Sequence, residues 1–94
     1  MNRDWILFHL NEAMEELQRT IQDLHRRDYT ERQFRIAMEH AYNHVNTAWN
    51  SRIVRDRRIR NLTDEDFYRW RQFPKDIDLS AGENPDRLLK KKSK

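Results

Sequence analysis

Cysteine is absent from this 94-residue chain, glycine occurs once and proline twice. Without cysteine there is no disulfide framework, no thiolate metal site and no cysteine nucleophile. Because β-rich folds depend on tight turns, and tight turns depend on glycine and proline, the scarcity of both argues against a sheet protein. The chain also lacks a signal-like apolar N-terminus and any apolar run near the ~20 residues of a membrane span. We therefore expect a cytoplasmic protein without membrane contact.

Apolar material is scarce as well. Hydrophobic residues make up 36% of the chain and charged residues 37%. A chain of this length buries only about 60–65% of the surface that its unfolded form exposes, so its core is marginal. A second copy or another protein is therefore expected to complete the core.

The net positive charge of +3 comes entirely from the second half of the chain. Residues 1–50 carry 6 basic and 8 acidic side chains, a net −2, whereas residues 51–94 carry 13 and 8, a net +5. Any nucleic-acid-binding surface would therefore belong to the second half.

Two long helices are predicted, over about residues 4–27 and 31–52. Asn2 or Asp4 can cap the first, and Thr30 with Gln33 forms a capping box that starts the second. Each helix carries large or small apolar residues at alternating steps of three and four, the pattern of one helix face. In order, the stripes are Leu7, Leu10, Met14, Leu17, Ile21 and Leu24, then Phe34, Met38, Ala41, Val45 and Ala48.

The short connection between these helices predicts an antiparallel hairpin. We expect the two stripes to pack against each other, which leaves the residues beside them half-exposed. The flanking residues are Ile6, Ala13, Ala37 and Trp49.

A short third helix is predicted over about residues 64–72, because Thr63 and Asp66 repeat the capping pattern and Pro74 stops the helix. Residues 52–61 either extend the second helix or form a basic linker. Residues 1–79 are expected to form one domain, and residues 80–94 a disordered basic tail. The predicted fold class is all-α: an antiparallel two-helix hairpin plus a short third helix.

A metal site is a weak hypothesis on His40 and His44, which lie one helical turn apart and can reach one ion. The carboxylate motifs that usually accompany such pairs are missing. The favoured interpretation is that both histidines pack beside the stripe, so no metal and no cofactor is assigned.

The open end of the hairpin is a second candidate site. Aromatic rings beside amide groups can bind a nucleobase, a peptide or a small anion. The favoured alternative is that the tryptophans close the hairpin as a small core, with their N–H groups bonded to asparagines. The residues expected there are Trp5, His9, His44, Asn46, Trp49, Asn50 and Trp70.

An arginine-rich segment is the third candidate, because arginine binds phosphate through its two-pronged guanidinium. Its members are Arg52, Arg55, Arg57, Arg58 and Arg60. The acidic residues 64–66 follow at once and can neutralise part of this charge.

No catalytic residue is assigned, since no serine lies in a nucleophile turn and there is no glycine loop to hold phosphate. The sequence favours a non-enzymatic protein-interaction module that forms a homodimer or binds another protein. The alternative is a small nucleic-acid-binding protein that uses residues 52–60.

Overall fold

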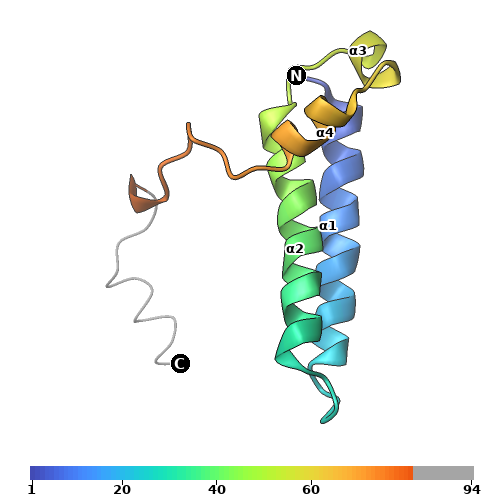
Figure 1. Cartoon of the computed structure of the whole chain (residues 1–94), viewed down its shortest axis with the longest axis vertical. Helices are drawn as coiled ribbons and strands as arrows, with labels where there is room; N and C mark the ends of the chain where they lie inside the picture. The colour runs from blue at the N-terminus through green and yellow to red at the C-terminus, as the bar shows by residue number, and fades with distance from the viewer. Residues whose placement is uncertain (82–94) are drawn as a thin grey trace.

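A computed structural model describes residues 1–81, and this part of the chain is all-α, with no strand. Two long helices lie side by side and antiparallel (Figure 1), which confirms the predicted hairpin. Two short helices follow at its open end. The elements are α1 (Arg3–Asp23), α2 (Glu31–Asn50), α3 (Asp56–Arg60), α4 (Asp64–Trp70) and the 3₁₀ turn η1 (Leu79–Ala81). Within the described residues, no helix has the length and apolar character needed to cross a membrane.

The helix starts follow from local capping. The Asn2 side chain accepts a hydrogen bond from the Trp5 backbone N–H at 3.2 Å and caps α1. Thr30 and Gln33 form the predicted capping box of α2, with reciprocal side chain–backbone bonds of 3.2 and 2.8 Å. Each bond satisfies an N–H group that the helix itself leaves without a partner.

The same motif recurs at α4, where Thr63 and Asp66 exchange bonds of 3.1 and 3.4 Å. α4 ends at Trp70, two residues before the predicted limit. α1 ends at Asp23, four residues before its predicted limit. There, His25 and the residue after it bond to carbonyls three residues back, which tightens the last turn and closes the helix.

Residues 52–61 are neither a continuation of α2 nor a plain linker. α2 ends at Asn50, a turn follows in which Val54 N–H bonds to Ser51 C=O, and α3 then begins at Asp56. From α3 the chain returns across the hairpin, and α4 lies over its near side in Figure 1. Of the predicted tail, residues 80 and 81 belong to η1, and residues 82–94 lie outside the described part.

The contact between α1 and α2 consists of small side chains. The predicted packing of Ala41 and Ala48 between the helices is confirmed, but the prediction for two flanking alanines was wrong. Ala13 is only 3% exposed and Ala37 only 6%, although both were expected to be half-exposed beside the core. Ala41, Ala48 and Thr20 are buried with them. Small residues let two helix backbones approach closely, and that approach turns the larger apolar residues away from the contact.

Candidate functional site

The large apolar residues of the hairpin form an exposed surface, which we call the apolar face. The exposed fractions of its members other than Met38 run from 38% at Phe34 to 61% at Ile21. Met38 is the one member that is half-buried. The apolar face consists of Leu7, Leu10, Met14, Leu17 and Ile21 from α1, its C-cap Leu24, and Phe34, Met38 and Val45 from α2.

Helical geometry puts both contributions on the same side of the hairpin. Around the axis of α1, the stripe is rotated by roughly a quarter turn from the positions that are buried against α2. Around the axis of α2, Met38 and Val45 are rotated from the buried alanines in the same direction. Because the two helices are antiparallel, rotations in the same direction bring both apolar stripes to the same side of the hairpin. α4 packs against α2 through Asn46 and Asn50, away from the apolar face.

Two histidines meet inside the open half of the hairpin. The Nδ1 atoms of His9 on α1 and His44 on α2 lie 2.9 Å apart, a hydrogen bond in which one ring donates and the other accepts. The rings of Trp5 and Phe8 pack against His9 in T-shaped contacts. Their ring centroids lie 4.3 and 5.1 Å from the centroid of the His9 ring. Burial, and secondly the charge on His44, lower the pKa of His9 to about 4.

The metal hypothesis gains nothing from this arrangement. His44 turns its Nδ1 toward His9, while His40 is exposed on the surface of α2. Within residues 1–81 no three histidine or carboxylate side chains gather closely enough to hold a metal ion.

Two other candidate residues of the open end, Asn46 and Asn50, hold α4 in place. Asn50 donates from its side-chain nitrogen to the carbonyls of Trp70 and Gln72, at 2.8 and 2.7 Å. Asn46 donates to the carbonyl of Arg71 at 3.0 Å. The carbonyls of Trp70 and of the C-cap residue Arg71 lie at the end of α4, where a helix leaves them without intrahelical partners, and Gln72 follows directly. The two asparagines therefore cap the C-terminus of α4 and seat the buried Trp70.

Trp49 lies in a separate arrangement. The Arg52 guanidinium carbon lies 3.8 Å from the centre of a Trp49 ring, and the indole N–H donates to Asp76 at 2.9 Å. Arg52 also forms an ion pair with Asp76 at 3.7 Å. The bond from Trp49 is the main cause of the lowered pKa of Asp76. The structure thus places Trp5, His9 and His44 together, and Trp49 apart from them.

The five candidate arginines divide into two groups. Arg52 is held by Trp49 and Asp76, and Arg58 donates to Asp66 at 2.7 Å. Arg55, Arg57 and Arg60 are exposed and form no ion pair within the described residues. Only the second group has charge available for a partner.

Three polar residues that the sequence did not single out as site residues organise the open end. Ser51 is fully buried and accepts the indole N–H of Trp5 at 2.8 Å, while its hydroxyl donates to the Thr47 carbonyl. Asn2 bonds to the turn after α2, and the buried Asp66 binds two arginines. The capping pattern identifies Asn2 and Asp66, but no sequence signal marks Ser51, because its role depends on the register between α1 and α2.

Comparison of the chain with protein-family models, with curated proteins and with solved structures found no match.

Proposed function

We propose that this protein is a non-enzymatic interaction module that self-associates, and that its apolar face is the surface that two copies share. The observation that carries the proposal is the exposure of large aliphatic side chains along nearly the whole of α1, from Leu7 to Leu24. Monomeric proteins rarely leave a contiguous apolar patch of this extent in water.

The area supports a stable interface. Half-exposed side chains of this number and size leave on the order of 800 Å² on one copy, which is about what each partner contributes to a standard protein–protein interface. A symmetric pair would bury twice that area.

The small internal core supports the same conclusion. Within the part of the chain that the structure describes, the buried apolar residues of one copy are Ala13, Ala37, Ala41, Ala48 and Trp70. Alanines bury little surface, so the hairpin by itself gains little from the hydrophobic effect. Two hairpins that pack by their apolar faces would form a four-helix arrangement whose centre holds the large side chains.

A second copy is the occupant that this face fits best. The residues of the α1 stripe, from Leu7 to Leu24, are all uncharged, so the stripe itself offers no charge pattern for an unlike partner to match. An uncharged apolar surface is complementary to a second copy of itself. In a dimer with a two-fold axis through the centre of this surface, α1 of one copy would pack against α1 or α2 of the other.

The test is the absolute mass of the purified chain by size exclusion with light scattering, over a range of concentrations. Self-association predicts a mass of twice the 11.7 kDa of one chain, falling toward 11.7 kDa on dilution. A mass of one chain at every concentration, with the helices intact by circular dichroism, would contradict the proposal.

A further inference from the structure

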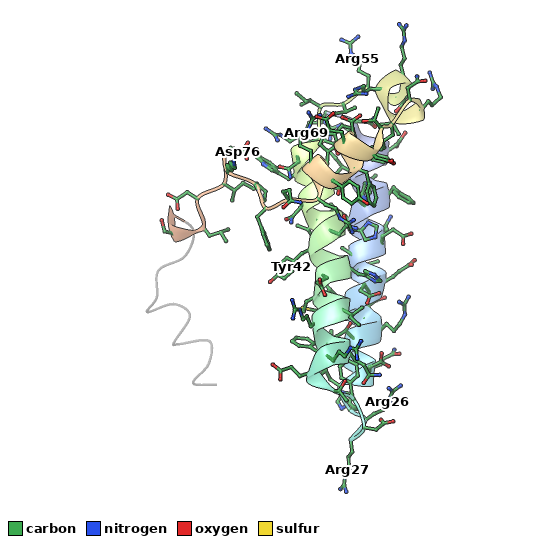
Figure 2. All side chains as sticks on the ribbon, viewed as in Figure 1. Arg26, Arg27, Tyr42, Arg55, Arg69 and Asp76 are labelled. Carbon is green, nitrogen blue, oxygen red and sulfur yellow. The ribbon has the colours of Figure 1, made fainter. Side chains whose placement is uncertain are left out.

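Beside α3 the surface contains an open hollow of about 570 Å³. Its lining combines aliphatic side chains with arginines, and consists of Ile53, Val54, Arg55, Arg57, Arg58 and Asn61. This volume lies within the range of sites that bind small molecules or single nucleotide units. The hollow lies at the open end of the hairpin, where Figure 2 labels Arg55.

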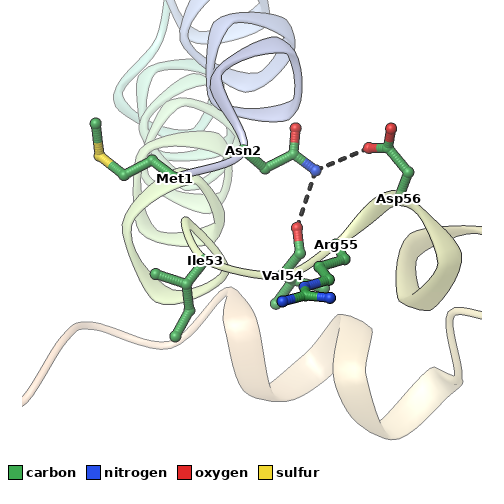
Figure 3. Close-up of a pocket in the computed structure, with 6 residues that line it drawn as sticks. All are labelled: Met1, Asn2, Ile53, Val54, Arg55 and Asp56. Atoms are coloured by element: carbon green, nitrogen blue, oxygen red, sulfur yellow. Dashed lines mark hydrogen bonds between the residues drawn. The ribbon is translucent and has the colours of Figure 1, made fainter.

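One wall of the hollow is fixed by the N-terminus. The Asn2 backbone N–H donates to the carbonyl of Arg52 at 2.7 Å. Its side-chain nitrogen donates to the carbonyl of Val54 and to the carboxylate of Asp56, each at 2.9 Å (Figure 3). The turn that carries Ile53 and Val54 is therefore tied to the start of α1.

The other wall is fixed by a buried carboxylate. Asp66 is 1% exposed, and its Oδ1 accepts from Arg58 at 2.7 Å and from Arg69 at 2.9 Å. The bond to Arg58 joins α3 to α4 and holds that guanidinium at the edge of the hollow. Because both walls are held in the free protein, a ligand would cost little additional ordering.

The remaining arginines of the hollow have no internal acid. Arg55, the N-cap residue of α3, and Arg57 within α3 are exposed and lack an ion pair within the described residues. The one acidic residue of α3 is Asp56. Asp56 accepts from Asn2 instead. Unpaired guanidinium groups bind phosphate by paired N–H donors and stack on bases, and the aliphatic floor provides an apolar contact for a base.

We propose that this hollow binds a nucleotide unit of single-stranded nucleic acid, with Arg55 and Arg57 on the phosphates and the base against Ile53 and Val54. The apolar floor favours a nucleotide over a bare phosphate or a sulfate. This activity is independent of the apolar face, which contributes no residue to the hollow.

The experiment measures binding of the full chain to a fluorescently labelled single-stranded RNA by anisotropy, as a function of salt. Contacts to two or three phosphates predict that the log of affinity falls with the log of salt with a slope of about −2. Replacing Arg55 and Arg57 together by glutamine should weaken binding roughly tenfold and make the slope shallower by about 0.7 for each arginine removed.

The matched control is the double substitution R27Q/R32Q, which removes the same charge from exposed arginines at the closed end of the hairpin. Figure 2 labels Arg27 there. Any contribution from the lysines at positions 90–94 is common to both variants. An equal loss in both variants would show that net charge alone attracts RNA, and would overturn the proposal.

Two further results would also overturn it: no binding by the parent at low salt, or displacement of the RNA by a phosphopeptide at equal phosphate concentration. The mass of each variant by light scattering keeps this test separate from self-association. A binding defect in R55Q/R57Q at unchanged mass concerns the hollow alone.

Discussion

The Nδ1 atoms of His9 and His44 lie 2.9 Å apart, so a single hydrogen is shared between two imidazoles that belong to different long helices. His9 is 8% exposed, and its other ring nitrogen, Nε2, is buried without a hydrogen-bond partner among the described residues. Among residues 1–81, His44 is the one titratable neighbour that acts on the pKa of His9, and no carboxylate there offsets a positive charge on it. Protonation of His9 therefore places an uncompensated cation between α1 and α2.

This geometry predicts that folding stability falls in mild acid. Burial and then His44 lower the pKa of His9 from 6.5 to about 4, so the unfolded chain binds a proton in that interval that the folded chain does not. Stability from this group is present above pH 6.5 and is lost as pH falls from 6.5 toward 4, by about 3 kcal/mol in total. Urea unfolding followed by circular dichroism at several pH values measures the change.

The control for the acid effect is a substitution at each of two histidines. H9Q should flatten the loss of stability between pH 6.5 and 4, whereas H25Q, in the exposed loop after α1, should leave it unchanged. If H9Q loses stability with the same pH profile as the parent, the carboxylates and not the histidine pair determine it.

The alanine contact between α1 and α2 predicts sensitivity to added volume. Ala13 is 3% exposed, and a leucine there would force the two helices apart, which costs about 1–3 kcal/mol. A leucine at the exposed Gln18, on the same helix, meets solvent instead of α2 and should change stability by less than about 0.5 kcal/mol. Chemical unfolding of A13L and Q18L provides the comparison, and equal stabilities would mean that the helices do not meet at Ala13.

Local chemistry made the helix starts predictable from the sequence. Thr30 with Gln33 and Thr63 with Asp66 act within four residues of one another, so no knowledge of the rest of the fold is needed. The antiparallel hairpin follows equally directly from the short connection after α1. The final turns were less accurate, because their ends depend on 3₁₀-type bonds such as the one made by His25.

The side of each helix that faces its neighbour could not be obtained in the same way. A stripe of large apolar residues identifies a surface that avoids water, but it does not say whether that surface is covered by the same chain or by another. Ala13 and Ala37 showed the true contact only after the register was known. The meeting of His9 with His44 depends on the same register, and so do the roles of Asn46 and Asn50 in capping α4.

The apolar face predicts that a charge at its centre produces monomers. M14E places a carboxylate where the proposed interface would bury it without a partner, so the association should weaken by at least about 3 kcal/mol, or more than a hundredfold. The matched control is I36E, because Ile36 has the same exposed fraction, 48%, and lies on the opposite side of the hairpin. Light scattering should give one chain mass for M14E and the parent mass for I36E, while dissociation of both variants would point to a loss of folding rather than of an interface.

The buried carboxylate of Asp66 predicts that the cap formed by α3 and α4 loosens separately from the hairpin. D66N keeps the size of the side chain but removes the charge that binds Arg58 and Arg69. The expected loss of stability is about 1–2 kcal/mol, because both arginines are half-exposed and are hydrated again when the ion pairs are lost. Amide hydrogen exchange should accelerate across residues 56–70 and remain slow in α1 and α2, because the alanine contact does not involve Asp66. D64N is the control, since Asp64 is exposed in the same first turn and forms no ion pair within the described residues. Uniform acceleration over the whole of residues 3–70 in D66N would mean instead that the cap and the hairpin unfold as one unit.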